Sequence, residues 1–377
     1  AQGQFVRDLH GLRKKGQRGA KCTLRTGADC GIPQNTRMSD TTHLLIPYAA
    51  STSAGCQQAL EGLALPHVDQ LLARLAPHAA QTDTGEETSL STPHERALAR
   101  ALALPSNNGR IPWAAWHRHQ QGRIDKVGAM EESEVGNDSY KSHSGQGWAF
   151  VSPCQWHVSA DQVTLRDPET LGVDEAASRA LLAIVSPWFA EDGITLLYDQ
   201  PTRWLARSPL FTELATASLE RVLQRDVRAW MPDVRTARVL HRLNNEMQML
   251  LYTHALNDER AHRGLPMINS FWVHGTGALP QALGPTHNAP HNAPLTPTTL
   301  RDAAVREDWR AWAAAWTALD AGPVAQLVRQ AEAGIPVQLT LCGERNALGF
   351  HTAPRSIVQR IQSLFRPQRF KDIHNQL

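Results

Sequence analysis

The sequence has 377 residues, of which 42% are hydrophobic and 20% charged, and its formal net charge is +2. This composition is that of a globular protein, and a chain of this length can bury a large core without disulfides or structural metals. It contains no run of about 18 apolar residues, so no transmembrane helix is expected.

The cysteines are odd in number and include no C-x-x-C pair. This pattern argues against a disulfide framework and against a thiolate zinc site. Free and mostly buried thiols are typical of a reducing compartment, so we expect a cytoplasmic protein. The cysteines are Cys22, Cys30, Cys56, Cys154 and Cys342.

Basic residues are concentrated at the start of the sequence. Residues 1–37 carry eight Lys/Arg against two Asp, a net charge of +6, whereas the rest carries 30 basic and 34 acidic residues, a net charge of −4. The body therefore has no nucleic-acid signature. The basic start is open to interpretation as a nucleic-acid or membrane arm, although it lacks the apolar stretch of a secretory signal. Because Met38-Ser39-Asp40 directly precedes the first strand-like segment, we expect residues 1–38 to be a disordered or non-native extension.

The first half of the chain predicts a strand, two helices and a long loop. Residues 43–48 are mostly apolar and predict a buried strand. Leucines recur at helical spacing over 60–75, and Thr92-Pro93-His94-Glu95 forms a capping box that starts a helix ending near Leu104. Residues 105–147 are rich in Gly, Ser, Asn and charge, with Trp113 and Trp116 as anchors, and we expect part of this stretch to be a mobile insertion.

In the second half, strands and helices alternate. Apolar patterns predict strands at 148–152, 162–165, 194–198, 271–274 and 337–341, and helices from Asp174, at 212–230, at 234–252 and along the Trp309, Trp312 and Trp316 face. The tail after residue 355 is short and basic. This alternation is typical of a largely parallel sheet covered by helices on both faces, so the predicted fold class is α/β.

Three segments are candidates for chemistry. Ser91 and Thr92 precede a helix N-terminus, which favours an anionic substrate or a phosphorylated hydroxyl, but Thr92 also suits a plain helix cap. A nucleophilic hydroxyl needs a base, and the nearest in sequence is His94. Arg203 follows a buried strand and suits an anion clamp. Gly275-Thr276-Gly277 suits either a turn or a ligand cradle.

Several segments together resemble the archaeal-type cofactor-independent phosphoglycerate mutases. The resemblance is carried by the strand at 43–47 with Leu65-Pro66-His67-Val68-Asp69, by Pro201-Thr202-Arg203-Trp204, and by Ile268-Asn269-Ser270-Phe271-Trp272-Val273-His274-Gly275. The chain looks closer still to a proteobacterial branch labelled regulatory protein RpfE type. The resemblance implies an alkaline phosphatase-like core at 39–105 and 240–350, a smaller inserted α/β domain at 106–239 with a mobile loop, and a C-terminal tail at 351–377. It also implies two divalent metals, Mn or Zn, and a phosphoserine intermediate.

The chain departs from that family at the metal-binding positions. Tyr48 stands where the family has an aspartate, the family's Gly-Ser-Asp is absent near Ser91 and Thr92, and the late Asp-His pair corresponds to Cys342-Gly343-Glu344-Arg345. Arg does not deprotonate, so Arg345 would place a fixed cation where a metal should sit. Two-metal phosphoryl transfer needs several carboxylates and imidazoles.

We therefore expect a phosphoglycerate mutase-like protein with a degenerate metal site, binding a small phosphorylated or carboxylated metabolite in a regulatory role and holding no cofactor. The expected catalytic residues are Ser91 and Thr92, and the expected substrate-binding residues are Tyr48, Arg203, Asn269, His274 and Arg345. The alternative is an active 2,3-bisphosphoglycerate-independent phosphoglycerate mutase or phosphohydrolase with two Mn or Zn ions and ligands such as Asp69, His94 or His157. A protein partner is the third reading; neither nucleic acid nor membrane is an expected partner.

Overall fold

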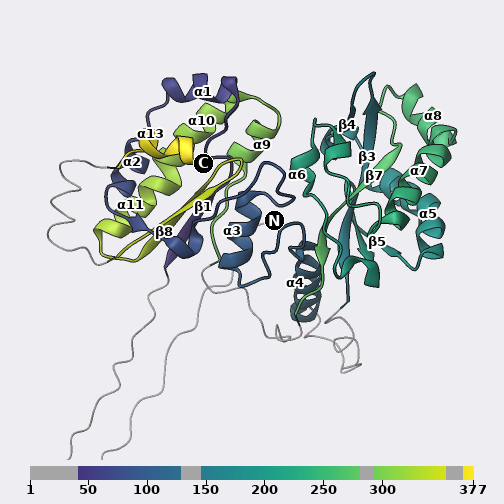
Figure 1. The fold of residues 1–377 in the computed structure, drawn as a ribbon, viewed down its shortest axis with the longest axis horizontal. Helices are drawn as coiled ribbons and strands as arrows, with labels where there is room; N and C mark the ends of the chain where they lie inside the picture. Colours follow the sequence, from purple (N-terminus) through teal and green to yellow (C-terminus); the bar gives the residue numbers. More distant parts are fainter. Residues whose placement is uncertain (1–40, 129–145, 281–292, 354–367) are drawn as a thin grey trace, which may run out of the picture. The chain divides into compact units, whose positions relative to one another are not determined.

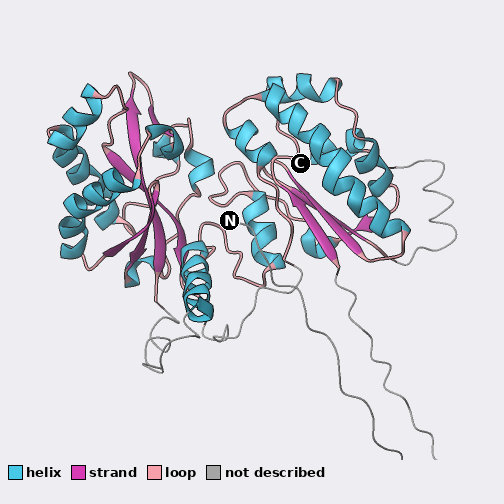
Figure 2. Ribbon diagram, turned by 180° about the vertical axis from the view of Figure 1, so that it is seen from behind, coloured by secondary structure: helices cyan, strands magenta, loops and turns pink. Residues whose placement is uncertain are grey.

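The computed structural model describes residues 41–128, 146–280, 293–353 and 368–377. The predicted extension at 1–38, part of the predicted mobile loop and part of the C-terminal tail lie outside these ranges. Residues 39–377 form one compact unit, and its described elements make up two sheets with helices packed against them (Figures 1 and 2). None of the described helices has the length and apolar character needed to cross a membrane.

The first sheet has the strand order β1-β8-β9-β2. Its strands are β1 (Thr42–Ile46), β8 (Val337–Cys342), β9 (Ala347–His351) and β2 (Ala76–Pro77). β1 runs parallel to β8, whereas β8 and β9 form an antiparallel hairpin. The end of β1 and the turn after β8 therefore lie beside each other, and the Ala49 N–H donates to the Cys342 carbonyl over 2.7 Å.

Helices cover both faces of this sheet. The strand period of two sends Leu44 and Ile46 into the larger cluster and Leu45 to the opposite face, where it meets Ala97. The latter belongs to α3 (Pro93–Ala101). The larger cluster is built by α1 (Ala54–Glu61), α2 (Pro66–Leu72), α9 (Thr299–Val305), α10 (Trp309–Leu319), α11 (Ala325–Glu332) and α13 (Phe370–Ile373).

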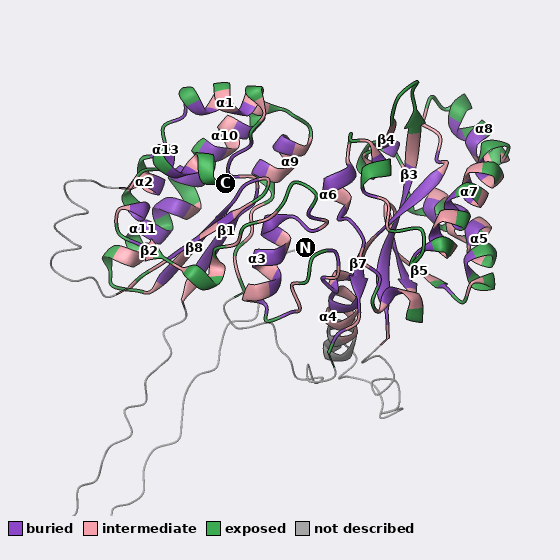
Figure 3. Ribbon diagram, viewed as in Figure 1, coloured by how far each residue is buried: buried purple, intermediate pink, exposed green. Residues whose placement is uncertain are grey.

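The second sheet is antiparallel throughout its named strands. It contains β3 (Trp148–Val158), β4 (Val163–Arg166), β5 (Thr195–Gln200), β6 (Arg203–Arg207) and β7 (Ser270–Gly277), with β3 pairing to β4, β6 and β7. Figure 3 shows β3 and β7 largely buried, whereas β5 alternates between intermediate and exposed residues.

Helices also pack on both faces of the second sheet. Ala149 and Val151 face α5 (Glu175–Glu191) and α7 (Arg238–Tyr252), whereas Trp148 and Phe150 face α4 (Trp113–Gly128). The remaining α-helices of this part are α6 (Leu219–Val222) and α8 (Ala255–His262). Short 3₁₀ turns and one π-helical turn complete the described elements, at Ala79–Gln81, Pro168–Leu171, Pro209–Phe211, Val227–Ala229, His374–Gln376 and Asp320–Val324.

The predicted elements are largely confirmed, but the predicted parallel sheet is wrong. Among the described named strands, only β1 and β8 pair in parallel. The predicted strands are confirmed as β1, β3, β4, β5, β7 and β8, and the helices as α3, α5, α7 and α10. The alternation of strands and helices along the chain does not decide which strands become neighbours. Short connections such as 201–202 between β5 and β6 force antiparallel pairing, because parallel strands need a long crossover.

Three further details differ from the expectations. Residues 270–277, which the resemblance placed with the first core, pair with β3 in the second sheet. Within the predicted helix at 212–230, only the short α6 forms as an α-helix. Ser218 is the N-cap residue of α6, and Asp226 caps a separate 3₁₀ turn. Within the expected loop at 105–147, the structure forms α4, anchored by the buried Trp116.

Candidate functional site

The turn after β1 is held by tryptophans of α10. Tyr48 has a positive φ of 51°, a left-handed conformation that is uncommon for a bulky residue. The Trp312 indole N–H donates to the Tyr48 carbonyl over 2.9 Å, and the Trp316 N–H donates to the Ala49 carbonyl over 3.1 Å. The tryptophan face of α10 thus packs in the core and also fixes the backbone that presents the Tyr48 phenol.

Tyr48 and Glu220, the latter on α6, line one small cavity, and the Tyr48 hydroxyl helps to stabilise the ionised Glu220 carboxylate. Glu220 Oε2 is 3.3 Å from His94 Nε2, and Glu220 Oε1 is 3.5 Å from Arg301 Nη1. We call these four residues, Tyr48, His94, Glu220 and Arg301, the Glu220 cluster. They come from the β1 turn, α3, α6 and α9, so the cluster depends on several separate segments.

Burial and charge act in opposite directions on the Glu220 cluster. Burial raises the pKa of Glu220, but His94, Arg301 and the Tyr48 hydroxyl outweigh it and hold the pKa below its ordinary value. The pKa of Tyr48 is raised well above its ordinary value, first by burial and then by the Glu220 charge. The cluster therefore pairs an ionised carboxylate with a protonated phenol.

The hydroxyls of Ser91 and Thr92 are occupied by local hydrogen bonds. The Thr92 hydroxyl accepts from the Glu95 N–H (3.4 Å) and donates to the Glu95 carboxylate (3.0 Å), which confirms the predicted capping box. The Ser91 hydroxyl accepts from the Gly109 N–H over 2.8 Å. Both side chains are thereby tied to the loops around the start of α3.

The geometry at His94 differs from that of a nucleophile–base relay. Such a relay uses one ring nitrogen for the hydroxyl and the other for the carboxylate. Here His94 Nε2 faces both the Thr92 hydroxyl, at 3.3 Å, and Glu220. His94 Nδ1 is buried and has no hydrogen-bond partner among the described residues. The arrangement is that of a helix cap, and a catalytic role for Ser91 or Thr92 stays a prediction.

A pocket of about 320 Å³ adjoins the Glu220 cluster. It is lined by Arg203 and His274, two of the predicted substrate-binding residues, together with Glu220 and Arg301. Its charged lining consists of three guanidinium groups (Arg203, Arg301, Arg306) and five carboxyl groups (Glu95, Asp167, Glu169, Glu220, Asp302). A pocket of this volume suits a compact and strongly polar molecule.

Arg203 is held in place at the start of β6. Its Nε and Nη2 donate to Asp199 Oδ2 over 2.9 and 2.7 Å, and its guanidinium lies 4.4 Å from the centre of the Phe150 ring. Burial raises the pKa of Asp199, but hydrogen bonds from His117 and Arg203 outweigh it and bring the pKa to about 2. Arg203 is therefore a fixed cation at the pocket wall.

His274 is the neutral member of this wall. Its pKa is lowered to about 3, first by burial and then by the Arg203 charge. Its Nε2 lies 3.2 Å from the Ser152 hydroxyl, and Ser152 also lines the pocket. At neutral pH the pair offers hydrogen-bonding groups without charge.

The remaining predicted residues lie elsewhere. Tyr48 and Thr92 line a neighbouring cavity with Glu220, Arg221 and Glu344, whose free volume of about 10 Å³ has room for roughly one water molecule. Neither Asn269 nor Arg345 lines either space.

Asn269 holds two strands together, because its amide bonds both the N–H and the carbonyl of Trp156. Arg345 is exposed and pairs with Glu87 over 3.0 Å. The structure therefore brings Arg203 and His274 into one pocket and places Asn269 and Arg345 outside it.

The two metals implied by the family resemblance do not fit the residues present. Glu344 is the one carboxylate among the matched positions, and it already accepts from the hydroxyls of Ser51 (2.9 Å) and Thr52 (2.8 Å). The alternative ligand Asp69 accepts from the Phe370 N–H, and His157 is exposed on β3. In the described part of the chain, no three His, Cys, Asp or Glu side chains form a group that could hold a metal.

Sequence reasoning missed Glu220 and Arg301. Glu220 stands in the run Leu219-Glu220-Arg221-Val222, which reads as an ordinary amphipathic helix. No pattern in the sequence marks it, because the relevant observation, that the charged Arg221 is only 5% exposed, comes from the structure. A charged pair in a segment that is otherwise buried indicates a polar site at that place.

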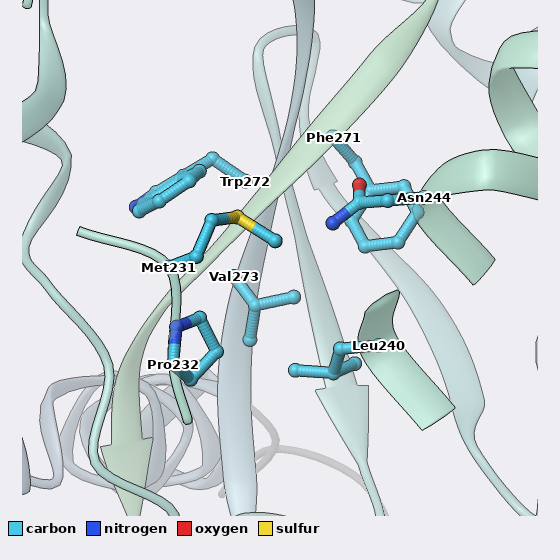
Figure 4. A pocket seen from close by; sticks show the side chains of 7 residues that line it. All are labelled: Met231, Pro232, Leu240, Asn244, Phe271, Trp272 and Val273. Atoms are coloured by element: carbon cyan, nitrogen blue, oxygen red, sulfur yellow. The ribbon is translucent and has the colours of Figure 1, made fainter. Parts of the chain in front are cut away.

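A separate small cavity lies beside the second sheet (Figure 4). Its lining is apolar apart from Asn244, whose side-chain oxygen accepts from the Ser270 hydroxyl over 3.1 Å. Its free volume is about 10 Å³, and none of the predicted site residues lines it. It is a packing void rather than a binding site.

No protein-family model and no curated protein matches the chain. Among solved structures, it is similar to the cofactor-independent phosphoglycerate mutase from Thermoplasma acidophilum, with 12% identity, 82% of this chain and 89% of that chain covered, and a TM-score of 0.30. It is also similar to the PH0037 protein from Pyrococcus horikoshii, with 12% identity, coverages of 83% and 88%, and a TM-score of 0.39. Likenesses at these TM-scores carry no argument about the site or its activity.

Proposed function

We propose that this protein binds a compact metabolite bearing a phosphate or carboxylate group in the pocket lined by Arg203, His274 and Arg301, and that it serves a regulatory role. The observation that carries the proposal is the presence of three guanidinium groups in one pocket of about 320 Å³. Guanidinium groups suit planar and tetrahedral oxyanions because their N–H donors form a fork.

The states of Arg203 and Arg306 support anion binding. Arg203 is pre-positioned by Asp199, so little side-chain entropy is lost when it engages a ligand. Arg306 is exposed and forms no ion pair with any residue that the structure describes, so its donors are available. Together with Arg301 they supply fixed and adaptable contacts at one site.

Binding is favoured over turnover by the arrangement around α3. The Thr92 hydroxyl serves the helix cap, and the positions that match the family's metal ligands hold Tyr48, Glu344 and Arg345. A pocket that retains anion-binding groups beside an altered catalytic centre is suited to sensing a metabolite. This is the sense in which we propose a regulatory, phosphoglycerate mutase-like pseudoenzyme of the RpfE type.

The proposal is tested by calorimetric titration with 3-phosphoglycerate and, separately, with inorganic phosphate. Arg306→Met should weaken binding of 3-phosphoglycerate about tenfold or more, because a hydrogen bond to a charged group contributes roughly 1.5–3 kcal/mol. The matched control is Arg310→Met, since Arg310 is also exposed but lies outside the pocket lining. Arg310→Met should leave the affinity unchanged.

Two results would count against the proposal. Failure of every small phosphorylated or carboxylated compound tested, 3-phosphoglycerate among them, to bind at millimolar concentration would remove its basis. Interconversion of phosphoglycerates by the purified protein, abolished by a chelator and restored by manganese or zinc, would instead establish the active mutase that the family resemblance left open.

A further inference from the structure

The charges around the pocket do not match a purely anionic ligand. Of the three guanidinium groups, Arg203 is paired with Asp199, and Arg301 is paired with Asp302 (2.7 Å) and with Glu220. Arg306 is the one lining guanidinium without an ion pair in the described ranges. Five carboxyl groups line the same space, so acidic groups outnumber basic ones.

The wall formed by the start of α6 adds hydrogen-bonding groups that lack partners. Ser218 is 7% exposed, lines the pocket, and its hydroxyl has no hydrogen-bond partner among the described residues. Glu220 Oε2 is buried and, although it lies near His94 Nε2, accepts no hydrogen bond of regular geometry within the described part. Buried polar groups of this kind are normally satisfied by a ligand or by water.

An ammonium group fits this wall better than a hydroxyl does. An ammonium carries three donors and no acceptor, whereas a hydroxyl carries one donor. Two opposite unit charges close together near a protein surface attract each other, before the costs of desolvation are counted. Because Glu220 is ionised, an ammonium group of the ligand beside it is attracted to the carboxylate. An anionic group of the ligand at the same position would be repelled.

We propose that the ligand is zwitterionic, with an ammonium group held by Glu220 and Ser218 and a phosphate or carboxylate group held by Arg301 and Arg306. The chemical class is a short amino-acid-like or aminoalkyl phosphate or carboxylate. This inference rests on the proposed function and specifies the ligand of the same pocket.

O-Phospho-L-serine and 3-phosphoglycerate make a matched pair of probes, because they share one carbon skeleton and differ by an ammonium in place of a hydroxyl. Each is titrated into the full chain by calorimetry at pH 7. We expect O-phospho-L-serine to bind at least tenfold more tightly. Glu220→Gln should reduce this preference to within threefold, whereas Glu307→Gln, an exposed change outside the pocket lining, should leave it intact.

The outcomes separate the two proposals. If 3-phosphoglycerate binds as tightly as O-phospho-L-serine or more tightly, the zwitterion inference is overturned and the proposed function stands. If neither compound binds, both are overturned. If the preference exists but survives in a folded Glu220→Gln variant, checked by circular dichroism, the assignment of the ammonium to Glu220 is wrong. The wild-type comparison decides the ligand class even where that variant does not fold.

Discussion

Replacing Trp316 by Phe tests whether α10 holds the turn that carries Tyr48. Trp316 and Ala49 are both fully buried, and the indole N–H donates to the Ala49 carbonyl over 3.1 Å. Phenylalanine keeps an aromatic ring but removes the donor. The Ala49 carbonyl then loses this partner in a site that water does not easily reach.

The expected cost follows from two contributions. A buried carbonyl without its donor costs about 1–3 kcal/mol, and the smaller ring adds ~1 kcal/mol by comparison with other large-to-small core changes. Trp316→Phe should therefore lower the free energy of unfolding by about 2–4 kcal/mol. The measurement is urea unfolding followed by far-UV circular dichroism, which does not depend on tryptophan emission.

The same helix supplies graded controls. Trp312 donates to the Tyr48 carbonyl in a partly buried bond, so Trp312→Phe should cost less than Trp316→Phe. Trp309 is only partly buried, and its indole N–H has no acceptor among the described residues, so Trp309→Phe should cost ~1 kcal/mol or less. Equal losses for all three variants, within about 0.5 kcal/mol, would refute the hydrogen-bond argument and leave ring packing as the sole cause.

Three further predictions concern the cap, the pH dependence and metals. Thr92→Ala should lower the free energy of unfolding, measured in urea, by about 1 kcal/mol, because it breaks the capping box of α3. Thr298→Ala should lower it less, because the Thr298 side chain caps no backbone N–H. Equal losses for the two variants would contradict the cap. Burial lowers the pKa of His43 to about 4, so His43 should account for a loss of about 3 kcal/mol of stability as pH drops from 6.5 to 4, since the unfolded chain binds the proton first; the buried His274 adds to the wild-type loss. His43→Phe should therefore make the pH slope shallower by about that amount, and His157→Phe should leave the slope unchanged. Incubation with EDTA should leave the thermal midpoint unchanged, and a lower midpoint restored by manganese or zinc would show a metal site that the described donors do not form.

The sequence by itself determined most of the local structure. The capping box at Thr92 and Glu95, the apolar strand after Thr42 and the tryptophan face of α10 are short-range patterns, and each forms the expected element. Such patterns depend on neighbouring residues along the chain, so a linear reading captures them. The same reading pointed to Arg203 and His274, which line one pocket in the structure.

Only the tertiary structure decided how these elements pair and which charges meet. Strand order depends on connection lengths and on which buried faces pack together, which is why β7 joins β3 and the expected parallel sheet did not form. Glu220, His94 and Arg301 lie far apart in sequence and become partners because α6, α3 and α9 pack around one pocket. Burial and the charges of these neighbouring side chains together shift their pKa values. Neither the burial nor this proximity exists in the unfolded chain.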